Sequence, residues 1–177
     1  MRHSLVLTFF VFISFRAAAE SPRLGPIFED YGPTFAGEGL ETPVDEDIVY
    51  RAVFDVAGYR GGTGALNSRL ESVARFINMH VRHGVPLDKL DLAVVLHGEA
   101  LKTALAHESY RQRYGADNPS LDLLEQLIGT GVQVYVCGQS LGFREVGPDE
   151  LIAPVDVALS AMTMLVALQA EGYALLP

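Results

Sequence analysis

The stretch GVQVYVCGQSLG, residues 131–142, decides the fold. Apolar and β-branched side chains from Val132 to Val136 predict a strand. The strand ends at Cys137, the only cysteine of the chain, and a glycine follows at once. If a helical turn begins there, its free backbone N–H groups face the sulfur and favour the thiolate.

Four further segments have the composition of strands. Residues 48–58 combine alternation with β-rich residue types, which predicts a first strand. Residues 90–96 are apolar apart from Asp91, which is typical of a strand buried on both faces of a parallel sheet. Short strands are expected at 155–158 and 173–176.

Between the strands, apolar residues recur at helical spacing. The polar segment 111–120 and the segment 142–154 are expected to be irregular. We expect a first helix that begins at Ser68, with Glu71 in a capping box, and a second helix through Leu101 and Leu105. A third helix is expected to begin at Asn118 and Pro119, and a fourth, capped by Ser160, to span 161–171.

Alternation of strands and helices predicts a three-layer α/β/α sandwich with a mainly parallel sheet of about five strands. Sites in such sheets lie outside the carboxyl ends of the strands. Cys137 and His97 both fall there, since His97 follows the apolar strand over 90–96. These two residues are the candidate catalytic residues.

The composition excludes some classes of function. The chain has 177 residues and a formal charge of −9. An acidic surface argues against non-specific nucleic-acid binding and against a polybasic membrane-surface protein. The pattern predicts no cofactor and no metal site: His80 and His83 are spaced as a possible metal pair, but no third ligand is suggested nearby.

The first residues have the pattern of an export signal. A basic start, an apolar run of eleven residues and the small residues Ala17–Ala19 predict a signal peptide over 1–19. The alternative is an uncleaved anchor, although a spanning helix needs ~20 apolar residues. We therefore expect a periplasmic or secreted protein with no stable membrane anchor after cleavage. An extended arm rich in Pro, Gly and acids follows over 20–47, and the α/β domain occupies 48–177.

A single cysteine is unusual in an exported chain, because oxidising compartments favour paired cysteines. Three alternatives remain for Cys137: a buried inert residue, a residue paired with another molecule, or a working thiol. His97 is either a base beside that thiol or a residue that helps turn the strand. Met162 and Met164 are expected in the core, because they belong to an apolar helix.

The segment VYVCGQSLGFREVGPDELIAPVDVALSAMTMLVALQAEGYALLP, with VVLHGEAL before it, resembles the DsrE/DsrF-like family in its exported branch. The resemblance covers roughly residues 48–177 and implies a small α/β/α fold that forms homo-oligomers, either trimers or hexamers. Relay members of the family carry sulfur as a cysteine persulfide, and their sulfur-bearing cysteine matches Cys137. His97 matches the strand-end turn of the family, with no catalytic duty implied. The segment CGQSL is less apolar than the corresponding sequence of the relay members.

The leading hypothesis is an exported sulfur carrier that holds sulfane sulfur on Cys137 without a cofactor and exchanges it with a protein donor or acceptor. This hypothesis describes a sulfurtransferase-like persulfide carrier, and the sequence does not decide whether such a carrier acts as an enzyme. The alternative is a non-enzymatic ligand-binding or assembly module in which Cys137 is structural. A third hypothesis is a redox sensor that works through intermolecular disulfides or sulfenic acid.

Overall fold

The computed structural model describes residues 20–37, 39, 41–42, 44–58 and 61–177. The signal peptide predicted over 1–19 lies outside the described residues. Within the described ranges, none of the helices has the length and apolar character needed to cross a bilayer.

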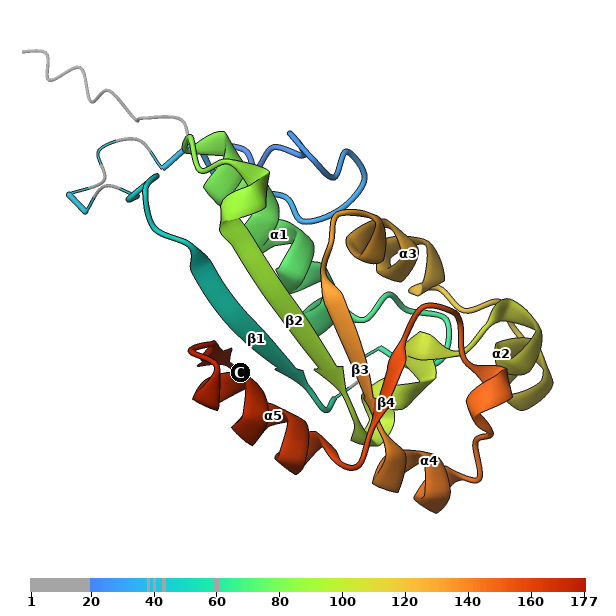
Figure 1. The fold of residues 1–177 in the computed structure, drawn as a ribbon. Coiled ribbons are helices and arrows are strands. Elements are labelled where there is room, and N and C mark those ends of the chain that lie inside the picture. The colour runs from blue at the N-terminus through green and yellow to red at the C-terminus, as the bar shows by residue number, and fades with distance from the viewer. Residues whose placement is uncertain (1–19, 38, 40, 43, 59–60) are drawn as a thin grey trace, which may run out of the picture.

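Five parallel strands form one sheet in the order β4-β3-β2-β1-β5 (Figure 1). This confirms the predicted α/β class and the mainly parallel sheet. The strands are β1 Tyr50–Val56, β2 Leu90–Leu96, β3 Gln133–Cys137, β4 Asp156–Ala158 and β5 Ala174–Leu176.

Helices cover both faces of the sheet, which gives the predicted three layers. The large core lies between one face and α1 and α3, whereas α5 covers the other face with a smaller cluster of buried side chains. The helices are α1 Ser68–Arg82, α2 His107–Tyr114, α3 Leu121–Gly129, α4 Gly138–Arg144 and α5 Ala161–Ala170, with short 3₁₀ helices at Leu87–Lys89, Gly98–Ala104 and Pro148–Glu150.

The helix α1 begins at Ser68 as predicted, but its capping residue and the start of α3 differ from the sequence prediction. The side chain of Asn67, not Ser68, accepts the N–H groups of the first turn of α1. The helix α3 begins after Ser120, because the Asn118 side chain accepts the Ser120 N–H in a turn before the helix. Local hydrogen bonds of this kind compete with the first helical turn and shift its start.

Three segments differ from the prediction: two that were expected to be irregular contain α-helix, and one expected helix is a 3₁₀ helix. The polar segment expected to be irregular from residue 111 contains the second half of α2. The helical turn expected after Cys137 continues as α4 to Arg144, inside the segment expected to be irregular from residue 142. The helix expected through Leu101 and Leu105 is the 3₁₀ helix Gly98–Ala104.

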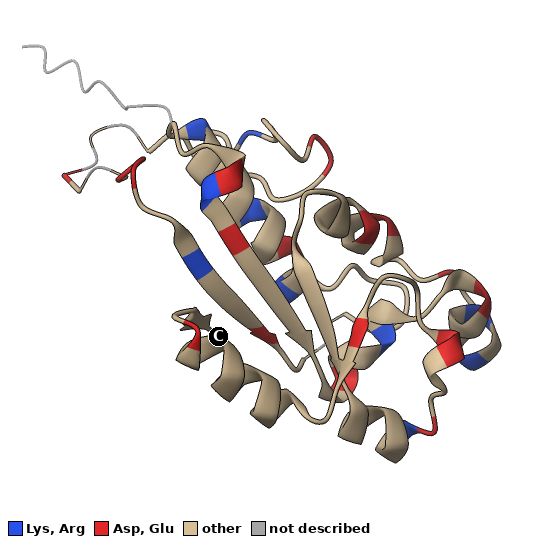
Figure 2. Cartoon of the chain, viewed as in Figure 1, with Lys and Arg blue, Asp and Glu red and all other residues tan. Residues whose placement is uncertain are grey.

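The methionine prediction is wrong for Met162. Its side chain is 76% exposed, because only one side of α5 packs on the sheet. Figure 2 shows that α5 nevertheless carries no charged side chain along its length, in agreement with its sequence AMTMLVALQA. The outer side of α5 is therefore an exposed apolar surface.

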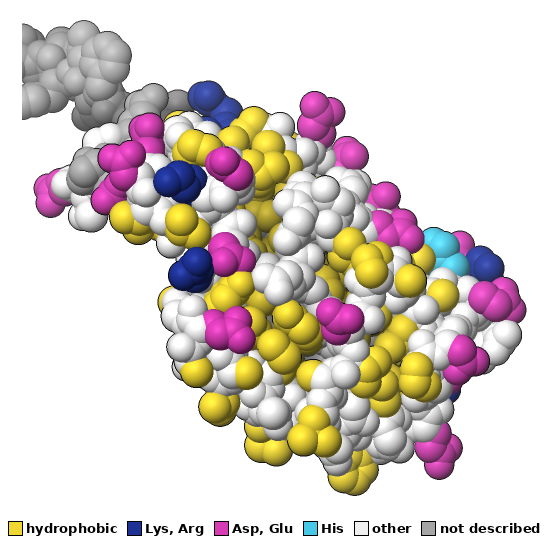
Figure 3. Space-filling view, in the orientation of Figure 1, with side chains coloured by type: hydrophobic (Ala, Val, Ile, Leu, Met, Phe, Trp, Pro, Cys, Tyr) yellow, Lys and Arg dark blue, Asp and Glu magenta, His cyan; other side chains and the backbone are white. Residues whose placement is uncertain are grey.

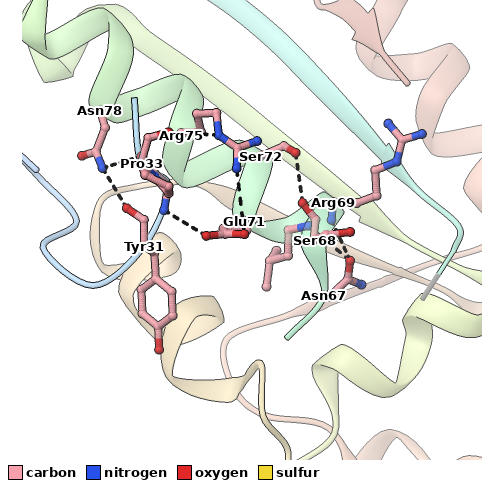
Figure 4. A network of polar contacts seen from close by, with 11 residues as sticks. Tyr31, Pro33, Asn67, Ser68, Arg69, Glu71, Ser72, Arg75 and Asn78 are labelled. Carbon is pink, nitrogen blue, oxygen red and sulfur yellow. Dashed lines mark hydrogen bonds and ion pairs between the residues drawn. The ribbon is translucent and has the colours of Figure 1, made fainter. Parts of the chain in front are cut away.

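The arm before β1 packs across α1. Asn78 of α1 is fully buried, and its side chain accepts the N–H groups of Ile27 and Phe28 and donates to the carbonyl oxygen of Phe28. It also donates to the carbonyl oxygen of Tyr31 (Figure 4). Phe28 is buried in the main core. The Asn78 amide thus ties the arm to the helix, and Arg75 and Arg82 of the same helix also donate to carbonyl oxygens of the arm.

Candidate functional site

Cys137 is the last residue of β3 and the residue before α4. Val136 points into the main core, so alternation turns Cys137 to the opposite face, where α5 lies. Its side chain is only 5% exposed. The thiol is therefore held between the sheet and two helix starts.

The groups that act on the pKa of the Cys137 thiol come from both helix starts. Burial on its own raises the pKa of the Cys137 thiol, but hydrogen bonds from the hydroxyl and N–H of Ser140 and from the N–H groups of Ala161 and Gln139 lower it below the ordinary value. Gln139 and Ser140 belong to the first turn of α4, and Ala161 is the first residue of α5. Such donors stabilise the thiolate, which is the nucleophilic form.

The Ser140 hydroxyl is itself oriented by the neighbouring strand end. The N–H of Gly98, just beyond β2, donates to Ser140 Oγ over 3.1 Å. Because that oxygen accepts from Gly98, its own hydrogen is free to point at the Cys137 sulfur. The end of β2 thus helps to set the thiol environment at the end of β3.

His97 lies level with Cys137 on the adjacent strand. Leu96 is paired with Val136 in the register of β2 and β3, so the next residues, His97 and Cys137, stand side by side at the carboxyl edge. His97 follows Val95 by two residues, and Val95 belongs to the cluster under α5. Both side chains therefore lie on the α5 face of the sheet.

Asp55 of β1 completes this row. It is paired in register with Val95, which places it on the same face. Its Oδ1 lies 2.6 Å from His97 Nε2. Since a carboxylate only accepts hydrogen bonds, this contact requires the proton of the imidazole on Nε2.

A pocket of about 380 Å³ opens over these side chains. It contains Asp55, His97 and Cys137 on its sheet side and apolar side chains of α5 on the other. The full lining is Asp55, His97, Cys137, Gln139, Ser160, Ala161, Met162 and Leu165. No arginine or lysine is among these lining residues.

The structure brings the two predicted site residues, Cys137 and His97, into one pocket. Among the described residues, no hydrogen bond joins their side chains, and the polar partner of His97 is Asp55. Sequence reasoning missed Asp55 and Ser140. The sequence does show Asp55 as a carboxylate near the end of a predicted strand. Its place beside His97 depends, however, on β1 lying next to β2, which the sequence pattern does not give.

Other titratable groups do not form a metal site in the part of the chain that the structure describes, where no three His, Cys, Asp or Glu side chains are placed to hold an ion. His80 and His83, the pair noted in the sequence, contact backbone carbonyl oxygens instead.

Comparison with known proteins assigns the domain. A model of the DsrE/DsrF-like family matches residues 51–177. The structure is similar to that of MTH1491 from Methanobacterium thermoautotrophicum, described as a protein of unknown function, with 21% identity, a TM-score of 0.52 and coverage of 72% of this chain and 97% of that one. It is also similar to the ychN protein from E. coli, with 20% identity, a TM-score of 0.52 and coverage of 71% and 96%. No curated protein matches the chain in sequence.

Proposed function

Because this chain belongs to the DsrE/DsrF-like family, we propose that it is a sulfur carrier that holds sulfane sulfur as a persulfide on Cys137. The observation that carries the proposal is the set of hydrogen-bond donors from α4 and α5 that lower the pKa of this thiol inside a pocket. An inert buried cysteine has no need of such donors, whereas a nucleophile does.

The transfer step follows from thiol chemistry. The Cys137 thiolate attacks the outer sulfur of a donor persulfide, R–S–SH. A new S–S bond forms on Cys137, the S–S bond of the donor breaks, and the donor leaves as a thiolate that takes up a proton. The step exchanges one S–S bond for another and needs no cofactor and no external oxidant.

His97 carries the proton in this scheme. It accepts the proton of the Cys137 thiol and returns it to the departing donor thiolate. Asp55 acts on the imidazole alone, because its 2.6 Å contact to Nε2 fixes the tautomer and the ring orientation. The shared pocket supports this assignment, and Asp55 is a positioning residue.

The sulfur donor or acceptor is a protein or small-molecule persulfide. The pocket supports this choice because its lining combines a carboxylate with apolar side chains and lacks a guanidinium or ammonium group to bind a dianion such as thiosulfate. The protein acts outside the cytoplasm, in the periplasm or as a secreted protein, after loss of residues 1–19. The export-signal pattern of the sequence supports this location.

The functional unit is a homo-oligomer, a trimer or a hexamer, that buries the outer side of α5. Exposed apolar side chains between α4 and α5 support this assembly: Phe143 of α4, Val157 of β4, Leu159, and Met162 and Val166 of α5. Figure 3 shows hydrophobic side chains gathered over this part of the molecule. A surface patch of this kind is typical of an interface with another chain.

An intact-mass measurement tests the proposal. The folded protein is incubated with glutathione persulfide and compared with Cys137→Ser and with Gln139→Ala, a pocket residue that keeps its backbone donor. We expect one added sulfur atom on the wild type and on Gln139→Ala, removable by a reductant, and none on Cys137→Ser. No adduct on the wild type, or an adduct that persists in Cys137→Ser, contradicts the proposal.

A second candidate function is a non-enzymatic binding or assembly module with a structural cysteine. The observation in its favour is the low exposure of Cys137, which packs with Val95 and Ala161 in the smaller core cluster. In that case thiol reagents reach Cys137 only after unfolding. Alkylation of the folded protein by iodoacetamide therefore separates the two candidates.

A further inference from the structure

The residue that follows the thiol, Gly138, has no room for a side chain. A Cβ atom built on it would lie 2.9 Å from the carbonyl oxygen of Ala158 and 3.4 Å from that of Leu159. Both are backbone atoms, at the end of β4 and just beyond it, so no side chain can turn aside to make space. Gly138 does not have a positive φ, so its own backbone conformation does not require glycine. The close approach of β4 does.

A second glycine of the same helix, Gly142, differs in this respect. Within the part of the chain that the structure describes, a Cβ atom on Gly142 meets nothing within 4 Å outside its own helix. Its φ is not positive either. Alanine is the better helix former at both positions, so a change to alanine does not weaken the helix itself. A comparison of the two positions therefore isolates the contact of Gly138 with β4.

The contact at Gly138 lies next to the thiol, where the end of β4 meets the start of α4 (Figure 1). Cys137 is paired in register with Ala158, so β4 ends level with the sulfur-bearing residue. Only two residues separate this strand end from Ala161, where α5 begins. Cys137 and Ala161 belong to the same buried cluster and line the same pocket. The position of the end of β4 therefore sets where the start of α5 lies over the thiol.

The start of α5 presents a backbone donor to this thiol. The N–H of Ala161 is among the groups that lower the pKa of Cys137. The side chain of Ser160 caps the helix by accepting the N–H of Thr163, so the cap does not take up the N–H of Ala161. The segment between β4 and α5 is thus placed to complete the surroundings of the sulfur.

We propose that Gly138 is a positioning residue: its missing side chain lets the end of β4 close on α4, and this brings the Ala161 N–H to the Cys137 sulfur. The inference rests on the proposed function, because it adds a residue that keeps the thiol of that site reactive. An alanine at position 138 pushes the backbone of Ala158 away, since an added methyl group in a close-packed contact forces the backbone to shift. The first turn of α5 moves with it. The thiolate then loses a donor, and the pKa of Cys137 rises.

The pH profile of Cys137 alkylation by iodoacetamide tests this inference in the purified protein. Gly138→Ala is expected to move the midpoint of the profile to higher pH. Alkylation near neutral pH should slow by roughly ten-fold, the effect of losing one hydrogen bond to a charged group. Gly142→Ala is expected to keep the wild-type profile. A purely structural role of Gly138 would lower the stability of the protein without moving the midpoint.

A second variant removes the donor itself and covers the case in which Gly138→Ala does not fold. Ala161→Pro has no N–H at this position, and proline is favoured at the first position of a helix. Ser160 already has the extended backbone that a following proline requires, with φ −156° and ψ 160°. We expect Ala161→Pro to keep the wild-type circular dichroism and to move the midpoint in the same direction as Gly138→Ala.

The inference is overturned if folded Gly138→Ala or Ala161→Pro keeps the wild-type profile, or if Gly142→Ala moves the midpoint as far as Gly138→Ala does. These results leave the proposed function untouched, because sulfur loading of the wild type is measured by mass. A wild type that gains no sulfur from glutathione persulfide contradicts the proposed function, whatever the profiles of the three variants show.

Discussion

The imidazole Nε2 of His97 lies 2.6 Å from Oδ1 of Asp55, a residue 42 positions earlier in the chain. The two residues stand at the carboxyl ends of neighbouring strands, beside Cys137 on the third strand. A carboxylate, an imidazole and a thiol are thereby placed in one pocket by strand order alone.

Replacement of Asp55 by Asn is expected to slow sulfur transfer by roughly ten-fold at neutral pH, because the imidazole loses the group that fixes its tautomer. Asp55 is not among the groups that bond the sulfur, so the pH dependence of Cys137 alkylation is expected to stay that of the wild type. Stopped-flow transfer from glutathione persulfide and iodoacetamide alkylation measure the two quantities. Asp156→Asn, at the exposed start of β4, is the matched control. Equal transfer rates in Asp55→Asn and wild type argue against a positioning role.

Replacement of Ser140 by Ala is expected to raise the pKa of the Cys137 thiol, because the hydroxyl donates to the thiolate and burial then acts with less opposition. Alkylation by iodoacetamide at neutral pH should slow by roughly ten-fold, in line with the loss of one hydrogen bond to a charged group. The pH profile of thiolate absorbance gives the direction of the change. Ser72→Ala, on the exposed side of α1, serves as the control. An unchanged profile in Ser140→Ala shows that the hydroxyl does not stabilise the thiolate.

The stability of the protein is expected to depend on pH through Cys137. Its pKa in the folded state is lower than the ordinary value of 9.0, so the folded state releases the thiol proton more readily than the unfolded chain. The resulting stabilisation is complete above the ordinary pKa and is lost as the pH falls through the lowered one. The difference in free energy of unfolding between wild type and Cys137→Ala should therefore grow as the pH rises towards about 9. Urea unfolding at several pH values measures it, and a difference that is constant or shrinks with pH contradicts the lowered pKa.

A charge on the outer side of α5 is expected to disrupt the oligomer. Val166 is exposed in the single chain and does not line the thiol pocket, so Val166→Glu introduces a buried charge only if a second chain covers this surface. Light scattering coupled to size-exclusion chromatography should show smaller particles than for the wild type. Leu24→Glu, at an exposed apolar position on the arm, is the control. A monomeric wild type would contradict the proposed oligomer. An oligomer of unchanged size in Val166→Glu would place the interface on another surface.

The sequence was sufficient for the sheet and most of its helices, because buried parallel strands and amphipathic helices leave strong local patterns. The two short helices were harder to predict. The helix α4 spans only seven residues, two of them glycine, and α2 has Tyr110 as its single buried residue. Neither carries an apolar stripe long enough to indicate a helix.

The site could be predicted only in part, for a different reason. Cys137 and His97 could be placed at strand ends, but their proximity depends on β2 and β3 being neighbours in the sheet. Asp55 enters the site through the same strand order, across three strands that are far apart in the sequence. The exposure of Met162 was missed because an apolar helix indicates burial without saying whether the covering surface belongs to the same chain.

The most direct test of the central claim is the intact mass of the folded protein after incubation with glutathione persulfide, measured beside Cys137→Ser. A sulfur carrier gains a single sulfur atom that a reductant removes and that an added thiol protein can accept, and the serine variant gains none. A folded wild type that gains no sulfur, with a thiol that reacts only after denaturation, would contradict the claim and assign Cys137 a structural role.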